Sequence, residues 1–455
     1  MNISRFRHIC NVQKFLFKFR TAHTASKSES GIEILTKQDA KITQSSAGIT
    51  VASVENYSPI SQVSVVIKAG SRYENPHNLG IVHCIKNCAT LSTKTHTAFS
   101  ITRNLEIQGS KIDVASNREY IIYTLQCIRD EIDSGLELLA DVTTNQAFKP
   151  WEVNDSTYNM ELDLAFLENN PEAILMEALH KAAFRGGLAN SLFCPSFMIG
   201  KHTTESLHNF VHENFAASKT SVVGLGVNHN NLESAVSKLF NLSNPSGSDG
   251  TTKFGGGEIR LEKDIPFVHT AIVAEGSGLD NTKDALSLGV LQCLLGTSKN
   301  SKLGSSEFSK LGSAASKSTN SPFTVSSLNV NYSDTGLFGV YIAGAPTDMK
   351  EIVKSVVSQM REITKSFSEN DVQNAKHHLK AKLAFARENS KDLMSEMVID
   401  TASVGHIRDI KDIEKSIDEL KTSDISAVAA RVMKTKPAMA SVGRLHSTPY
   451  LDELI

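Results

Sequence analysis

Residues 62–90 read QVSVVIKAGSRYENPHNLGIVHCIKNCAT: an apolar run of strand length, a Gly-Ser turn and an apolar segment of helical length. The same order returns at residues 267–297, FVHTAIVAEGSGLDNTKDALSLGVLQCLLGT. The two Gly-Ser pairs, Gly70-Ser71 and Gly276-Ser277, lie 206 residues apart. A strand–turn–helix unit that recurs at such a distance predicts an internal repeat.

Later segments of the two halves match in the same order. They are strand pairs with alternating apolar and polar residues at 110–128 and 324–344, amphipathic helices at 130–145 and 348–366, further helices at 148–166 and 367–385, and closing helix–strand units at 203–227 and 421–445. This pattern predicts an α+β fold of two homologous domains, each a mostly antiparallel sheet with helices packed on one face. We expect the two domains to face each other.

A segment rich in Gly, Ser, Asn and Thr nearly bisects the chain. It reads NLSNPSGSDGTTKFGGGE, residues 241–258, and its composition predicts an inter-domain linker. The expected domains are therefore residues 35–240 and 259–455. Two domains agree with the length of 455 residues, which is too long for a single hydrophobic core.

The N-terminal segment is basic and free of acidic residues up to Glu29. Apolar residues recur at roughly helical spacing between its arginines and lysines, and a stretch rich in Ser, Thr and Ala follows. These features are typical of a mitochondrial transit peptide, which we place at residues 1–25. The sequence thus predicts import into the mitochondrial matrix.

Composition excludes several classes of protein. A formal charge of −2 gives no reason to expect a nucleic-acid partner. Six dispersed cysteines with no C-x-x-C pair argue against a disulfide framework, a c-type haem and an iron–sulfur cluster. No apolar run reaches the roughly 18–20 residues that span a bilayer, so we expect membrane association only through partners.

The first repeat carries an altered metal motif in the stretch GIVHCIKNCA, residues 80–89. This stretch and the repeat resemble the pitrilysin-like (inverse-zincin, M16) peptidase family. Active members of that family carry H-x-x-E-H, in which two histidines bind zinc and the glutamate activates water. Here the corresponding positions hold His83, Lys86 and Asn87. A lysine cannot act as the base while it is charged, and an amide is a weak zinc ligand.

The family's third zinc ligand is a glutamate about 80 residues after the first histidine. In this chain Asp163 occupies that region, with Glu161 nearby. One histidine and one carboxylate do not make a hydrolytic zinc site, which needs three ligands and a base. We therefore expect no catalytic residue, no metal site and no cofactor-binding residue in this chain.

Two other groups of residues are potential metal ligands by residue type. Cys84 and Cys88 lie one helical turn apart, but His83 is offset from them by about 100° around a helix. We expect these cysteines to be buried as small hydrophobic side chains. The adjacent His377 and His378 point in different directions on a predicted helix and are expected to face solvent.

Several long strings carry a more specific resemblance to non-catalytic members of the family, the core proteins of the cytochrome bc1 complex (complex III). They are AGSRYE, LEIQGSKIDVASNREYIIYTLQCIRDEID, FKPWEV, GLANSLFCPSFMIGKHTTESLHNFV, GLGV, GGGEIR, YSDTGLFGVY and STPYLDELI. The alternative is the α subunit of the mitochondrial processing peptidase, which has a glycine-rich loop in its second domain. The matching segment here, residues 297–318, is expected to be flexible but has no glycine run.

The resemblance to the core proteins implies a structural role in electron transport from ubiquinol to cytochrome c. The implied partners are core protein 1, cytochrome b, cytochrome c1, the Rieske iron–sulfur protein and small subunits of a dimeric complex. Haem and iron–sulfur groups would then be carried by those partners. The implied location is the matrix side of the mitochondrial inner membrane. Two alternatives stay open for the cleft between the two domains: it holds a segment of a partner, or it is merely inherited with the peptidase fold.

Overall fold

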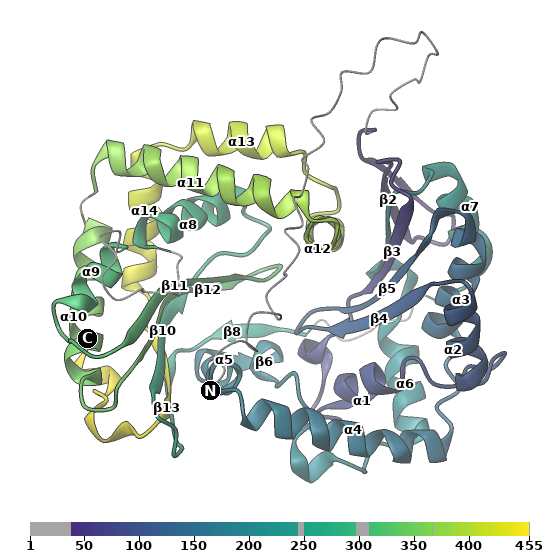
Figure 1. Ribbon diagram of the computed structural model, residues 1–455, viewed down its shortest axis with the longest axis horizontal. Helices are drawn as coiled ribbons and strands as arrows, with labels where there is room; N and C mark the ends of the chain where they lie inside the picture. The colour runs from purple at the N-terminus through teal and green to yellow at the C-terminus, as the bar shows by residue number, and fades with distance from the viewer. Residues whose placement is uncertain (1–37, 244–249, 297–308, 366, 455) are drawn as a thin grey trace, which may run out of the picture. The chain divides into compact units, whose positions relative to one another are not determined.

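The computed structural model describes residues 38–243, 250–296, 309–365 and 367–454 (Figure 1). The predicted transit peptide, residues 1–25, lies outside these residues and stays a prediction. Two main sheets organise the described chain, one in each half of the sequence. They are connected within one compact unit.

The first sheet has six strands. In spatial order they are β1 (Lys41–Gln44), β2 (Thr50–Val54), β7 (Thr220–Leu225), β3 (Ile60–Ile67), β5 (Ile121–Ile128) and β4 (Lys111–Ser116). Only β2 and β7 run parallel, and the other neighbours are antiparallel. The closing strand β7 therefore inserts between strands from the beginning of the chain.

The second sheet has five strands. In spatial order they are β11 (Phe323–Asn331), β12 (Gly336–Gly344), β10 (Val268–Glu275), β13 (Ala438–Gly443) and β9 (Gly257–Glu262). Again one neighbouring pair, β13 and β9, is parallel and the others are antiparallel. The prediction of two α+β domains with mostly antiparallel sheets is confirmed.

The helices follow the order predicted from the repeat. In the first half they are α1 (Ile81–Cys88), α2 (Ala98–Ile107), α3 (Ile132–Thr144), α4 (Pro150–Glu168), α5 (Pro171–Ala183), α6 (Thr204–Asn214) and α7 (His229–Leu239). In the second half they are α8 (Thr282–Leu295), α9 (Lys310–Ser316), α10 (Met349–Lys365), α11 (Glu369–Glu388), α12 (Ser390–Ser403), α13 (Ile410–Glu419) and α14 (Thr422–Lys434). The pairs α4–α5 and α11–α12 begin 219 residues apart.

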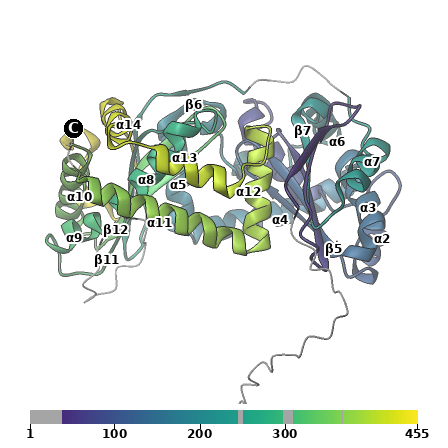
Figure 2. The same cartoon turned by 90° about the horizontal axis from the view of Figure 1, so that it is seen from above.

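The prediction that helices cover one face of each sheet is wrong, because each half lends a helix to the other half's sheet. Helix α5 buries Leu175 and Leu179 against residues of β10, β12 and β13 in the second sheet. Helix α12 buries Met394 and Met397 against β2, β3 and β7 in the first sheet, and Figure 2 shows α12 beside β7. An apolar sheet face must be covered, and here the exchanged helix covers it.

Two segments expected to lack structure contain regular elements. Within the predicted linker, β8 (Thr252–Phe254) pairs with β6 (Phe184–Gly186), and β9 begins at Gly257. The domain boundaries themselves stay predictions. In the segment expected to be a flexible loop after Gly296, α9 forms at its described end and buries Leu311 among apolar side chains.

A buried arginine fixes the turns of the two halves to each other. Arg72 lies in the turn after β3 and donates to Glu119 of the β4–β5 turn at 2.8 Å. Its guanidinium also makes a two-pronged ion pair with Asp334 of the β11–β12 turn, at 2.8 and 2.5 Å. Glu119 in turn accepts from the backbone N–H of Ser333. The β11–β12 turn at Asp334 thus also serves as an inter-half contact.

Candidate functional site

The altered motif lies on helix α1, and a residue of the preceding loop caps the N-terminus of this helix. Its N-cap residue Gly80 has φ +81° and offers no side chain to the helix. A Cβ at this glycine would stand 2.4 Å from Cys194 Cα. The carboxylate of Glu74 instead accepts hydrogen bonds from the backbone N–H groups of Gly80 and Val82, at 2.8 and 3.0 Å. Burial raises the pKa of Glu74 to about 8, although the two backbone hydrogen bonds act to lower it.

Helix α4 supplies the other side of the site. Its inner face buries Val153, Ser156 and Met160, which is the face that packs on α1. Asp163 lies next along this inner side and points its carboxylate at α1. The fold therefore brings the altered motif and the distant carboxylate together.

The hydrogen bonds of His83 determine which ring nitrogen carries the proton. The backbone N–H of Cys194 donates to Nδ1 at 3.2 Å. A neutral imidazole that accepts at Nδ1 carries its proton on Nε2. That nitrogen lies 2.8 Å from Asp163 Oδ2 and donates to it. The ring is 1% exposed, and burial lowers the pKa of His83 despite the bond to Asp163.

The residues that replace the rest of the zinc motif converge on the same carboxylate oxygen. The Lys86 ammonium lies 3.3 Å from Asp163 Oδ2, and the Asn87 amide nitrogen lies 3.4 Å from it. Asn87 also donates to the backbone carbonyl of His83 at 3.2 Å. Against the opposing effect of burial, the His83 hydrogen bond and the Lys86 charge lower the pKa of Asp163.

This arrangement does not fit the zinc ion of active family members. Two ligands of a tetrahedral zinc lie roughly 3.4 Å apart, whereas His83 Nε2 and Asp163 are at hydrogen-bond distance. The nitrogen that would bind the metal carries a proton instead of a free lone pair. The Lys86 ammonium adds a positive charge beside the same oxygen. The site is therefore a closed hydrogen-bonded cluster with no base positioned to activate water.

The remaining candidate ligands lie elsewhere or are buried as hydrophobic residues. Cys84 and Cys88 are 2% and 3% exposed within the first hydrophobic core, as predicted. Glu161 is exposed on α4, and His377 and His378 are exposed on α11. Within residues 38–243, 250–296, 309–365 and 367–454, no group of three or more His, Cys, Asp and Glu side chains could hold a metal.

A cleft of about 830 Å³ lies between the first sheet and the exchanged helix α12. Strand residues such as Gln62, Thr124 and Gln126 line one wall, and Asn389 and Lys391 line the other. The side chains of β3 and β5 that line this cleft alternate with those that pack on α1. The cleft and the His83 cluster therefore lie on opposite faces of the sheet.

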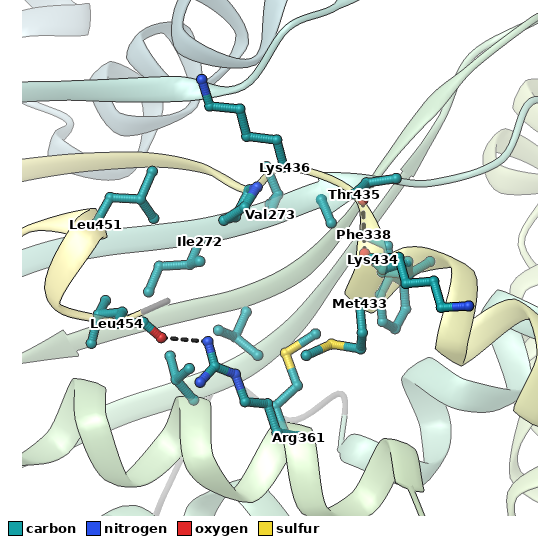
Figure 3. A pocket seen from close by; sticks show the side chains of 16 residues that line it. Ile272, Val273, Phe338, Arg361, Met433, Lys434, Thr435, Lys436, Leu451 and Leu454 are labelled. Carbon is teal, nitrogen blue, oxygen red and sulfur yellow. Dashed lines mark hydrogen bonds between the residues drawn. The ribbon is translucent and has the colours of Figure 1, made fainter.

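A second cavity, of about 280 Å³, lies wholly within the second half. It is mainly apolar and lies between the second sheet, α10, α14 and the C-terminal segment (Figure 3). Arg361 reaches from α10 to the backbone carbonyl of Leu454, as the dashed line in Figure 3 shows. The lining of this cavity contains none of the residues that the sequence analysis considered for a site.

Sequence reasoning missed the residues that hold the site and the halves in place. Glu74 and Arg72 stand in the string AGSRYE, which we used only as a mark of resemblance. A signal was present, because a charged residue directly after an apolar strand and before an apolar helix is often a capping or bridging group. The partners of Arg72, Glu119 and Asp334, are 47 and 262 residues away and could not be assigned without the fold.

Comparison with known proteins places the chain in a class. Residues 50–196 match the family model described as "Insulinase (Peptidase family M16)", and residues 201–379 match "Peptidase M16 inactive domain". A solved structure described as "Complex III2 from Candida albicans, Inz-5 bound" has the same fold, with a TM-score of 0.80 at 21% identity. The alignment covers 91% of this chain and 98% of that one. The class is thus that of the M16 peptidase-like proteins.

Closer relatives specify the family within this class. "Cytochrome b-c1 complex subunit 2, mitochondrial" of Homo sapiens is 38% identical over 92% of each chain. The protein of the same description from Rattus norvegicus is 36% identical, over 96% of this chain and 97% of its own. A probable mitochondrial-processing peptidase subunit alpha-2 of Arabidopsis thaliana is 28% identical over 90% of this chain and 83% of its own. The chain belongs to the family of cytochrome b-c1 complex subunit 2, which confirms the predicted resemblance.

The described residues also bear on membrane contact. Within them, no helix combines the length and the apolar character that crossing a bilayer requires.

Proposed function

We propose that this chain is a non-catalytic structural subunit of ubiquinol–cytochrome c reductase, the cytochrome b-c1 complex. The observation that carries the proposal is the 38% identity to subunit 2 of that complex over 92% of both chains. The His83 cluster supports the non-catalytic part, since Lys86 and Asn87 occupy the places of a base and a ligand and both bond Asp163. The processing-peptidase α-type subunit is the weaker alternative, with 28% identity.

The proposal extends to partners and location. As a subunit of this type, the chain would pair with core protein 1 and support cytochrome b, cytochrome c1, the Rieske protein and small subunits of a dimeric complex. It would lie on the matrix side of the mitochondrial inner membrane and hold no haem or iron–sulfur group itself. The closed His83 cluster, which has no free metal-binding nitrogen, supports the absence of a metal cofactor.

We also propose that the cleft beside α12 accommodates an extended segment of a partner. Its walls carry hydrogen-bonding side chains from β3, β5 and α12, and strand β4 is an edge strand with unpaired backbone groups along its outer side. A photo-reactive residue at Gln62 should cross-link to a segment of another subunit. Cross-links only to this chain would contradict the occupancy of the cleft.

The experiment that tests the main proposal is depletion of the chain, followed by blue-native electrophoresis and mass spectrometry of solubilised mitochondria. We expect the chain to migrate with cytochrome b, cytochrome c1 and the Rieske protein, and its depletion to lower ubiquinol–cytochrome c reductase activity. Rescue should be equal with the wild-type chain and with Lys86→Met, because the cluster has no catalytic role.

A different set of results would favour the alternative. Migration at roughly 100 kDa with an H-x-x-E-H protein, together with accumulation of uncleaved mitochondrial precursors on depletion, would identify a processing-peptidase subunit. Loss of function in the Lys86→Met variant at normal protein level would contradict a non-catalytic cluster.

A further inference from the structure

Helix α4 has two apolar faces on opposite sides, and the described residues cover only one of them. The inner face, with Val153, Ser156 and Met160, packs against α1. The outer face carries a stripe of four large side chains, which we call the α4 outer stripe: Trp151, Tyr158, Leu162 and Phe166. They are 63%, 69%, 42% and 64% exposed.

The spacing of the outer stripe places its members in one row. At 100° per residue these four positions fall within about 80° of the helix circumference. Three aromatic rings and a leucine together present on the order of 500 Å² of largely apolar surface. The largest apolar patch of a typical monomer measures about 300–600 Å² and is often functional, so a row of this size is a candidate interaction site.

The second half shows that the fold itself does not require the stripe. Helix α11 is the counterpart of α4 and buries Val372, Ala375 and Leu379 at the positions equivalent to the inner face of α4. At the positions equivalent to the outer stripe it carries Asn370, His377, Ala381 and Phe385. Only one of these four is a large apolar residue, so the equivalent helix of the second half folds without such a stripe.

Charge indicates what covers the stripe. Helix α4 contains five carboxylates and no lysine or arginine. Two of them, Glu152 and Asp163, bond Ser92 and His83. The other three, Asp155, Glu161 and Glu168, are exposed, and among the described residues no ion pair involves them. A partner must therefore tolerate or complement negative charge within and beside the row of aromatic rings.

The exposed carboxylates disfavour a second copy of the chain and an anionic membrane as the partner, and favour a cationic partner. A second copy of the chain packed α4 to α4 would bring the exposed carboxylates of both copies together, and an anionic bilayer would repel them. A cation suits the site, as Lys149 already shows by placing its ammonium 5.8 Å from the centre of the Trp151 ring.

We propose that the α4 outer stripe is a docking site for an amphipathic helix of another polypeptide, with an apolar row flanked by lysine and arginine. The apolar row of that helix covers Tyr158, Leu162 and Phe166, and its basic flanks lie beside Asp155 and Glu161. This inference goes beyond the proposed function, because it holds for any assembly that contains the chain.

The first test uses the purified full chain and a defined probe. The probe is a fluorescent peptide of about 14 residues with leucines on one helical face and lysines on the other, and its control carries glutamates in place of the lysines. The variant Trp151→Asn/Tyr158→His/Leu162→Ala gives α4 the residues of α11, and Tyr158→His alone serves if the triple variant does not fold. Phe385→Ala on α11 is the matched control.

We expect fluorescence anisotropy to show binding of the lysine peptide, at least about tenfold weaker binding to the triple variant, and no change with Phe385→Ala. Asp155→Asn/Glu161→Gln should reduce both the affinity and its dependence on salt. Equal binding to wild type and triple variant, equal binding of the glutamate peptide, or no binding would overturn the proposal.

A second test identifies the natural occupant. A photo-cross-linker at Leu162 in the assembled mitochondrial protein should give an adduct whose sequenced peptide comes from another polypeptide and has basic residues flanking an apolar helical row. An adduct within a second copy of this chain, or to lipid, would overturn the proposal. So would a dimer in analytical ultracentrifugation that dissociates in the triple variant.

Discussion

The helix pair α1–α4 of the first half and its counterpart α8–α11 in the second half pack in the same order on their sheets, but the residues of the His83 cluster are replaced in the second pair. His83 corresponds to Gly289, 206 residues later, and Asp163 corresponds to Lys382, 219 residues later. A Cβ at Gly289 would lie 3.3 Å from a methyl group of Leu379 on α11. The second pair is thus packed too closely for a histidine at this position.

This difference indicates that packing of the two helices in the repeat does not require the His83 cluster. In the second half a glycine and a lysine stand at the positions of His83 and Asp163, and the two helices contribute apolar side chains to a hydrophobic core. The first half keeps a buried histidine, whose hydrogen bonds must all be satisfied to offset the loss of water. Asp163 and the Cys194 backbone N–H satisfy them. The positions that bind zinc in active members of the family form a closed polar contact in this chain.

The largest expected effect concerns Arg72, for which the second half has no equivalent, since the corresponding residue is Gly278. Arg72→Met leaves the buried carboxylate of Glu119 without its charge partner, so the free energy of unfolding should fall by about 3–5 kcal/mol. Chemical denaturation measures this. As control, Arg444→Met breaks the exposed pair with Asp264 and should change stability by less than about 1 kcal/mol. Equal effects would mean that Arg72 does not fix the turns of the two halves.

The exchanged helices offer the next comparison, because Leu175 of α5 and Met394 of α12 are equivalent positions. Leu175 is fully buried and Met394 lines the cleft at 4% exposure. We expect Leu175→Ala to lower the free energy of unfolding by about 3–4 kcal/mol and Met394→Ala by about 2–3 kcal/mol. Lys181→Ala, at an exposed position of α5, should stay within about 0.5 kcal/mol. A negligible effect of both core changes would contradict the exchange.

The pH dependence should distinguish the two exchanged helices, since His180 of α5 corresponds to Ile399 of α12. Burial, aided by the charge of Arg118, lowers the pKa of His180 to about 3. Its stabilising effect is complete above the unfolded-state pKa near 6.5 and is lost as the pH falls towards 3. Stability should drop by about 2 kcal/mol from pH 7 to pH 5 through this group.

Denaturation of wild type and His180→Gln at pH 7, 6 and 5 measures this dependence, and the variant should show a flatter profile. His377→Gln, at an exposed position of α11, is the control and should retain the wild-type slope. A wild-type slope in His180→Gln would assign the acid sensitivity to another group.

The smallest effect is expected at the His83 cluster itself. Lys86 and Asp163 are each about one-third exposed, so Lys86→Met should change stability by no more than about 1 kcal/mol. Zinc should leave the Tm of the wild type unchanged, whereas Lys86→Glu/Asn87→His restores H-x-x-E-H beside Asp163 and should show a zinc-dependent rise of roughly 2–4 °C. A saturable zinc-dependent rise in the wild type would contradict the protonated Nε2 of His83.

Much of the fold could be predicted from sequence because the repeat signals are local. Strand, turn and helix periodicities recur between residues 62–90 and 267–297, and each repeat is read from neighbouring residues. The exchange of α5 and α12 could not be read in this way. An apolar helix does not specify in its own sequence which of two similar sheet faces it will cover.

The site was predicted in its members but not in its bonding. The distance in sequence between His83 and Asp163 followed the family pattern, and the structure places them in contact. The tautomer of His83 depends on the backbone of Cys194, 111 residues away, and the capping role of Glu74 depends on a left-handed glycine. Such contacts follow from the path of the chain rather than from residue type.

The exchange of α5 and α12 also has a consequence for the order in which the chain can mature. Val54, Val66, Val223 and Leu225 form the face of the first sheet that α12 covers. During synthesis from the N-terminus, the six strands of this sheet are complete once residue 225 has emerged, but residues 390–403 follow much later. The apolar face of the completed sheet therefore stays uncovered until α12 has been made, about 165 residues later, and exposed apolar surface of this kind makes an incompletely folded chain prone to aggregation.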